Sequence, residues 1–258
     1  MCWLVSEHRS GFRIIIRNYD LSIPFLNDKN FSEMAPAQRQ PRHEARQART
    51  DVYRQHIVAA AEAVFAERGF AAAKVQDISK LAGLSMGTIY AIFPSKDELL
   101  RAILEERGRE LLHLARAVAD RRVPPREALR MLSEGYIAYF AEHPNFLRMH
   151  LRDGTSWVLG PAPGTEGRVR LWKEIHDLQA GIFRRGISQG VFVNEDPGYL
   201  AKLYSAMDQV LLADWVGSGM KADQAQLSAR FQNLVERVFC RRQQTTDDRR
   251  QTTDDRRT

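Results

Sequence analysis

The sequence is poor in cysteine. Its 258 residues include only Cys2 and Cys240, which lie near opposite ends of the chain. One pair at this separation matches neither a disulfide framework nor the spacing of a metal site. Sparse cysteine is typical of proteins from a reducing compartment, so we expect a cytoplasmic protein.

Long hydrophobic runs are also missing. No stretch approaches the roughly 18 consecutive apolar residues that indicate a transmembrane helix. The apolar segment Phe12–Ile16 is interrupted by Arg13 and followed by Arg17, without a small-residue cleavage site, so it does not look like the core of a signal peptide. We therefore expect no membrane partner.

Motifs for catalysis and cofactor binding are absent as well. The sequence contains no G-x-S-x-G elbow, no H-E-x-x-H pair, no phosphate-binding glycine loop and no C-x-x-C pair. His143 and His150 are seven residues apart, but no acidic or thiol side chain is spaced to complete a metal site with them. We therefore expect no enzymatic activity, no cofactor and no bound metal.

The charge balance is positive. The 38 lysine and arginine residues outnumber the 32 acidic residues, which gives a formal net charge of +6. This excess favours an anionic partner, either nucleic acid or an anionic membrane surface, and charge alone does not choose between them. The length suits two domains, and an apolar fraction of 44% is ordinary for a globular protein with a core.

Both ends of the chain differ from its middle. Residues 1–33 have neither helical nor strand periodicity, and a polar, basic stretch begins at Met34. We expect Met34 to be the physiological start, and the alternative is a genuine N-terminal arm. The heptad QTTDDRR at Gln244–Arg250 repeats at Gln251–Arg257 with no apolar residue to bury, which predicts a disordered tail over 242–258.

Between these ends, apolar residues recur at steps of three and four. The pattern is clear over Tyr53–Phe65, and Gly69 follows where a helix would end. Strand-type alternation is missing over any useful length. Similar stripes occupy Leu129–Phe140, Leu171–Ile182, Leu200–Trp215 and Leu227–Val238. The pattern predicts an all-α protein of about nine helices.

The segment Lys74–Leu100, KVQDISKLAGLSMGTIYAIFPSKDELL, carries the strongest functional signal. Val75 and Ile78 mark the apolar face of one short helix, and Gly83 supplies a turn before a second helix that ends near Phe93. Two short helices joined by a glycine-containing turn form a helix-turn-helix. The second helix of such a unit can lie in the major groove of DNA.

Capping residues and basic residues surround this unit. Ser85 can cap the second helix, and Ser95–Glu98 has the pattern of a capping box for the next one. Lys96 then lies at a helix N-terminus, which suits a phosphate. An upstream basic arm can follow the DNA backbone, enter a minor groove or remain a solvated charge run. Its arginines are Arg39, Arg42, Arg46 and Arg49.

From Ile57 to Leu100 the sequence resembles the tetracycline-repressor (TetR/AcrR) family of bacterial transcriptional regulators. The stretches AVFAERGF and VQDISKLAGLSMGTIYAIFPSKDELL carry the resemblance. It implies a helix-turn-helix DNA-binding head of three helices over residues 50–97 and a larger helical body for ligand binding and dimerisation over 98–241. A flexible basic extension over 1–49 would precede them.

The resemblance also assigns roles by position. Thr88, Tyr90 and Lys96 would contact backbone phosphates, although Tyr90 can alternatively belong to the core. Met86 and Ala91 stand where family members often carry larger polar groups, and they can contact thymine methyl groups. The expected DNA-binding residues are Lys74, Ser85, Met86, Gly87, Thr88, Tyr90, Ala91 and Lys96.

The region Asp120–Cys240 is rich in aromatic residues. These either fill the core or line a pocket for a hydrophobic or aromatic small molecule, and the Gly- and Pro-rich segment Asp153–Gly167 can border that pocket. Asp208 and Gln209 lie within an apolar stripe and either bind the ligand or face solvent. The expected ligand contacts are Phe146, Met149, Trp157, Trp172 and Met207.

By the same resemblance, the amphipathic segments Pro197–Gly217 and Asp223–Arg241 would pack against their twins in a homodimer. Two-fold symmetry predicts a palindromic operator in double-stranded DNA. We predict a sequence-specific transcriptional regulator, a repressor that a small-molecule effector releases from DNA. The alternative is a non-specific architectural DNA-binding protein, and the sequence does not separate repression from activation.

Overall fold

The computed structural model describes residues 13–16, 19–22, 41–152 and 166–241. The chain forms two compact units, Met1–Arg49 and Thr50–Thr258. Met34, Trp157 and the repeated tail, for which the sequence analysis made predictions, lie outside the described residues.

The first unit contains a short hairpin. Strands β1 (Arg13–Ile16) and β2 (Tyr19–Ser22) pair in antiparallel register. The sequence analysis found no strand-type alternation of useful length, and this hairpin is the exception in an otherwise helical description. Strand β1 reads Arg-Ile-Ile-Ile and does not alternate, and β2 has only four residues, the shortest length over which alternation indicates a strand.

Helix α1 (Pro41–Arg68) begins earlier than expected. Proline suits the first turn of a helix because its φ is already helical and its missing N–H would have no partner there. The alanine, arginine and glutamine residues that follow have high helix propensity. Residues 41–49, which the sequence analysis assigned to a flexible extension, are therefore helical.

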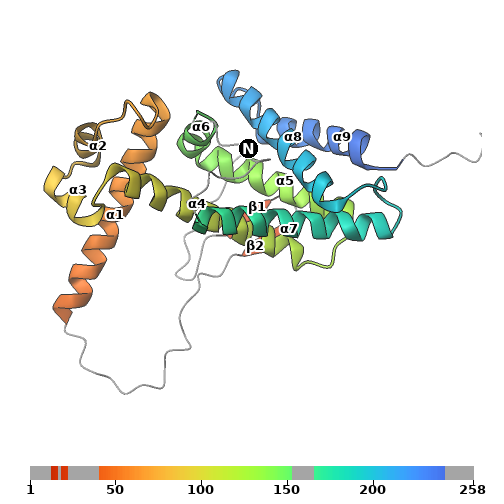
Figure 1. Ribbon diagram of the computed structural model, residues 1–258, viewed down its shortest axis with the longest axis horizontal. Helices are drawn as coiled ribbons and strands as arrows, with labels where there is room; N and C mark the ends of the chain where they lie inside the picture. Colours follow the sequence, from red (N-terminus) through yellow and green to blue (C-terminus); the bar gives the residue numbers. More distant parts are fainter. Residues whose placement is uncertain (1–12, 17–18, 23–40, 153–165, 242–258) are drawn as a thin grey trace, which may run out of the picture. The chain divides into compact units, whose positions relative to one another are not determined.

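The three helices that follow α1 are α2 (Val75–Ala82), α3 (Met86–Ile92) and α4 (Lys96–Ala119). Figure 1 shows α2 and α3 beside α1 and the first turns of α4. Their shared core is apolar and almost fully buried, and its main members are Ile57, Phe65, Ile78, Ile89, Phe93, Leu99 and Ile103. The three-helix head that the sequence predicts is thus present, and α4 continues from it without a break.

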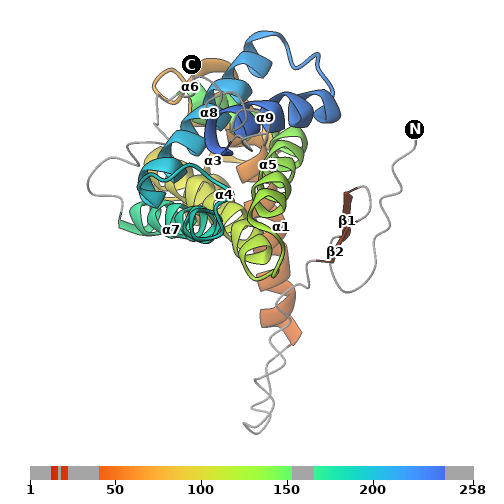
Figure 2. The same ribbon diagram turned by 90° about the vertical axis from the view of Figure 1, so that its right-hand side faces the viewer.

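The remaining helices form the body. They are α5 (Pro125–Glu142), α6 (Pro144–Arg152), α7 (Glu166–Ser188), α8 (Pro197–Gly217) and α9 (Gln224–Phe239). Helix α4 packs against α5 and α7, α7 also packs against α8, and α5 also packs against α9 (Figures 1 and 2). None of the helices that the structure describes has the length and apolar character of a membrane span.

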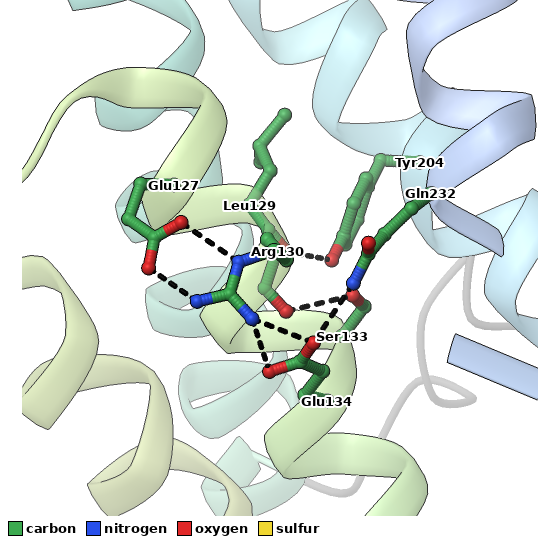
Figure 3. Close-up of polar contacts among 7 residues, drawn as sticks. All are labelled: Glu127, Leu129, Arg130, Ser133, Glu134, Tyr204 and Gln232. Carbon is green, nitrogen blue, oxygen red and sulfur yellow. Dashed lines mark hydrogen bonds and ion pairs between the residues drawn. The ribbon is translucent and has the colours of Figure 1, made fainter. Parts of the chain in front are cut away.

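Polar contacts hold α8 and α9 to α5 (Figure 3). The buried Tyr204 hydroxyl of α8 donates to the carbonyl oxygen of Leu129 at 3.0 Å. The Gln232 amide of α9 donates to the Glu134 carboxylate at 2.9 Å, and Arg130 pairs with the same carboxylate at 2.7 Å. The surface that α8 and α9 present is therefore anchored to the rest of the body.

The described residues contain nine α-helices. The predicted all-α class and helix number are confirmed, apart from the short hairpin. The predicted segment Pro197–Gly217 coincides with α8, because a capping Asp196 and a proline mark its start.

Candidate nucleic-acid interface and ligand cavity

The turn between α2 and α3 depends on Gly83. Its φ is +65°, a left-handed conformation that glycine adopts without the steric cost of a Cβ. The Leu84 N–H donates to the Ser79 carbonyl, and the Ser79 hydroxyl donates back to the Leu84 carbonyl at 2.6 Å. This local network ends α2 and sets the direction in which α3 starts.

Ser85 caps α3, as the sequence predicts. Its Oγ accepts a hydrogen bond from the Thr88 N–H at 3.1 Å and lies 2.9 Å from the Thr88 hydroxyl. A side chain that caps a helix satisfies one of the free N–H groups of the first turn. The two hydroxyls therefore form a small polar surface at the N-terminus of α3.

The outer face of α3 is small and uncharged. Gly87 and Ala91 are exposed, Met86 and Thr88 are half-buried, and the Tyr90 side chain is 45% exposed. The exposure of Tyr90 favours the surface interpretation over the core interpretation. Ile89, on the opposite face, is buried and holds α3 against the head core.

Lys74 and Lys96 lie in different environments. Lys74 is exposed at the N-cap of α2 and makes no side-chain capping bond. The Lys96 ammonium instead donates to the carbonyls of Phe70 at 2.7 Å and Ala73 at 3.1 Å, and it lies 4.4 Å from the centroid of the Phe70 ring. Lys96 therefore clamps the loop between α1 and α2, a role that the sequence analysis missed.

The capping box predicted at the start of α4 is only half formed. Ser95 Oγ accepts from the Glu98 N–H at 3.1 Å, while the Glu98 carboxylate pairs with Arg101 at 3.2 Å. A complete capping box is found at the start of α9 instead, where Asp223 and Gln226 cap each other.

A pair of lysine variants separates the structural role from DNA contact. We expect Lys96→Met to lower the free energy of unfolding by about 2 kcal/mol, because hydrogen bonds from charged groups contribute about 1.5–3 kcal/mol. We expect Lys74→Met to leave stability unchanged but to lower the slope of log K against log salt by about 0.9, the value for one lost phosphate contact. Urea unfolding measures the free energy of unfolding of both variants, and DNA binding at several salt concentrations measures their salt slopes. If Lys96→Met also reduced the slope of log K against log salt, Lys96 would contact a DNA phosphate after all.

The body contains an apolar cavity of about 140 Å³ between α4, α5, α6, α7 and α8. Phe146 and Trp172, two of the expected ligand residues, line it. Met149 is buried but is not among the lining residues, and Met207 lies on a different surface. The other lining residues are Leu104, Gly108, Leu111, Tyr136, Phe140, His150, Arg168, Leu171, Ile175, His176 and Ser205.

One end of the cavity is polar. Tyr136 and Ser205 line it, and the buried Ser205 hydroxyl donates to Gln179 Oε1 at 3.1 Å. Asp208 is buried as well, so it does not face solvent, but it is not among the residues that line the cavity. Burial raises the pKa of Asp208 to about 7, and burial together with the charge of Asp208 raises the pKa of Tyr136.

The cavity lining also includes basic groups. His150 and Arg168 both line the cavity. Burial, reinforced by the charge of Arg168, lowers the pKa of His150 to about 4, so this imidazole is neutral at pH 7. Sequence reasoning missed His150 as a lining residue, because it weighed this histidine only as a metal ligand.

A second surface groove follows α8 and α9. Leu203, Met207 and Val210 of α8 line it together with Leu234 and Val238 of α9. Val210 is 69% exposed, Val238 is 44% exposed and Leu234 is 37% exposed. The outer face of this helix pair is therefore apolar and uncovered in the single chain.

Comparison with known proteins supports both parts of this description. Residues 57–103 match the family model described as bacterial regulatory proteins, tetR family. The transcriptional regulator TtgR of Pseudomonas putida is 40% identical over 80 residues, which is 31% of this chain and 38% of the relative. The chain matches about a third of the length of the curated relatives.

Solved structures extend the likeness over the body. PfmR of Thermus thermophilus, a TetR family transcriptional regulator, is 26% identical with a TM-score of 0.59, over 70% of this chain and 97% of its own. FadR of Bacillus subtilis, solved with stearoyl-CoA, is 21% identical with a TM-score of 0.60, over 70% of this chain and 96% of its own. The second likeness shows the fold alone.

Apart from the short β1–β2 hairpin, the described residues form a helical protein in which a helix-turn-helix head is joined to a larger helical body. The head, over residues 57–103, matches the tetR family of bacterial regulatory proteins, and the whole fold is similar to that of solved regulators of this family.

Proposed function

We propose that this protein is a dimeric transcriptional repressor that a small molecule releases from its operator. The observation that carries the proposal is the capped, outward-facing α3, joined through α4 to a body that contains an apolar cavity. DNA recognition would occupy the head, effector binding the cavity, and dimerisation the α8–α9 face.

DNA contact would be made mainly through small groups on α3. Gly87 allows the helix to approach the duplex closely, and the Thr88 and Tyr90 hydroxyls can bind phosphate oxygens. Met86 and Ala91 can contact thymine methyl groups in the major groove. Lys74 would add a phosphate contact from α2.

Dimerisation would cover the apolar face of α8 and α9. The exposed Val210 of α8 and Val238 of α9 suit a self-complementary interface, in which the same patch is used by both copies. A two-fold axis would place the two α3 helices on half-sites about 34 Å apart, which predicts a palindromic operator.

Effector release would pass through α6. Phe146 and His150 of α6 line the cavity, and Arg152 at its C-terminal end donates to the α1 carbonyls of Ala66 at 3.0 Å and Glu67 at 2.5 Å. A ligand that shifts α6 would therefore displace the end of α1 and alter the spacing of the two heads. The coupling expected for such a mechanism is about 1–3 kcal/mol, roughly 5- to 150-fold in DNA affinity.

Selection from a random pool of duplex DNA tests the DNA-binding function. We expect the full chain, at fixed physiological salt, to enrich one palindromic site, because two-fold symmetry requires two matching half-sites. The salt must be fixed because phosphate contacts make affinity steeply salt-dependent.

The variant Thr88→Val tests the contact from α3, because it keeps the shape of the side chain but removes its hydroxyl. It should weaken binding to the enriched site while the protein remains folded. Binding without an enriched site, which fades uniformly as salt rises, would contradict the proposal and support the architectural alternative.

A further inference from the structure

The size of the body cavity limits its occupant. The cavity measures about 140 Å³, and its walls are largely the side chains of Leu104, Leu111, Phe140, Phe146 and Leu171. A protein cavity of about 150 Å³ with similar apolar walls holds a molecule the size of benzene. The cavity therefore fits the apolar part of a compound with a single aromatic ring.

The polar end of the cavity contains unsatisfied hydrogen-bonding capacity. The Tyr136 hydroxyl is buried and lies near the Gln179 side chain, which influences its pKa, but it makes no hydrogen bond of normal geometry to any described residue. A buried hydroxyl without a partner costs about 1–3 kcal/mol, so such a group in a native protein calls for an explanation. Ser205 donates its proton to Gln179, which leaves its oxygen able to accept a further hydrogen bond.

The charges around the cavity disfavour an ionic ligand at this end. Asp208 lies one helical turn after Ser205 on α8, is fully buried, and has no hydrogen-bond partner for Oδ1 within the described chain. A ligand carboxylate bound near it would be repelled whenever Asp208 is ionised. Burial and the charge of Arg168 lower the pKa of His150, and the positive charge of Arg168 also disfavours a ligand cation in the same cavity.

We propose that the effector is an uncharged, single-ring aromatic compound with a hydroxyl group, a phenol, whose oxygen bonds to Tyr136 and Ser205. The inference rests on the proposed function, because it names the ligand class of the same cavity. A phenolic hydroxyl accepts a hydrogen bond from Tyr136 while it donates its proton to the Ser205 oxygen. Both unsatisfied groups are then paired, and the ring occupies the apolar volume.

Calorimetry with four ring-matched probes tests the ligand class on the full chain without DNA. The probes are 4-methylphenol, toluene, 4-methylbenzoate and 4-methylbenzylamine. We expect 4-methylphenol to bind about 3- to 10-fold more tightly than toluene, the factor expected for one net hydrogen bond. The carboxylate and the amine should bind at least tenfold more weakly than 4-methylphenol, because burial of an unpaired charge is costly.

Two tyrosine variants test the contact. Tyr136→Phe removes the unpaired hydroxyl, so it should weaken 4-methylphenol binding about 3- to 10-fold and leave toluene binding unchanged. Tyr204→Phe is the matched control, because the Tyr204 hydroxyl is also buried but already donates to the Leu129 carbonyl. This control should lower stability and preserve the preference for 4-methylphenol.

Three outcomes would overturn the ligand class. In the first, 4-methylbenzoate binds most tightly and Arg168→Gln loses that binding. In the second, 4-methylbenzylamine binds most tightly and Asp208→Asn loses that binding. In the third, none of the four probes binds. Failure of the proposed function gives a different result. In that case 4-methylphenol binds in the calorimeter and no operator is enriched, or the enriched operator is not released.

Discussion

Arg107→Met is expected to lower the free energy of unfolding by about 3–5 kcal/mol, the cost of removing one partner of a buried ion pair. Arg107 of α4 donates through Nε to Glu62 of α1 at 2.7 Å and through a terminal nitrogen to the second Glu62 oxygen at 3.3 Å. The side chains of Arg107 and Glu62 are only 15% and 8% exposed, respectively. The loss would be a large share of the roughly 5–15 kcal/mol that stabilises a typical domain.

The physical reason is the charge that remains. Burial alone would lower the pKa of Arg107, but the hydrogen bond and the charge of Glu62 outweigh this effect, so the pKa is raised. Without the guanidinium, the Glu62 carboxylate would stay buried and uncompensated. The second partner of Arg107, Glu110, would keep its hydrogen bond from the Tyr139 hydroxyl at 2.5 Å.

Urea unfolding of three variants measures the effect. The double variant Glu62→Met with Arg107→Met should recover much of the lost stability, because no buried charge is left. The matched control is Lys173→Met, whose exposed i,i+4 pair with Asp177 is screened by solvent, so its loss should leave the free energy of unfolding almost unchanged. Equal losses in Arg107→Met and Lys173→Met would contradict the assignment of a stability role to burial of the pair.

Val210→Asp should convert the proposed dimer to a monomer and weaken binding to the proposed operator by about 100-fold or more. Val210 is the most exposed of the large apolar side chains among the described residues, and it lies on the apolar α8–α9 face. Symmetry would place both copies of the new carboxylate in one desolvated interface. Each head would then bind its half-site alone and lose the roughly 10²- to 10⁴-fold gain that linkage of two sites provides.

Sedimentation equilibrium and DNA titration give the two readouts. Val169→Asp is the control, because Val169 is also an exposed valine, at 39%, but lies on α7 outside the α8–α9 groove. It should change neither molecular mass nor DNA affinity. A Val210→Asp protein that keeps dimer mass would show that the interface lies elsewhere.

The helix-turn-helix was predictable because its signals are local. Gly83 is in the left-handed conformation that the turn requires, and Ser85 caps α3 through the backbone three residues later. Both interactions span only a few residues, so the order of residue types is enough to indicate them. The exposure of Gly87, Tyr90 and Ala91 follows from the helical spacing of the buried Ile89.

The apolar stripe of α8 shows where local reasoning ends. The sequence places Leu203, Tyr204 and Met207 on one stripe, and in the structure they divide between two faces. Tyr204 is fully buried against α5, whereas Leu203 and Met207 line the outer groove. An α-helix turns by about 100° per residue, so neighbouring apolar rows look alike in sequence. Met207 therefore contributes to the groove and not to the cavity.

Long-range contacts account for the other differences. Lys96 donates to the carbonyl of Phe70, 26 residues earlier, and Tyr136 and Ser205 line one cavity because α5 and α8 both border it. The sequence by itself determined the helical class, the helix-turn-helix and its caps, because periodicity and capping act within a few turns. Tertiary packing alone decided which aromatic residues face the cavity, which charges are buried and which apolar face stays uncovered, because these depend on helices distant in the chain.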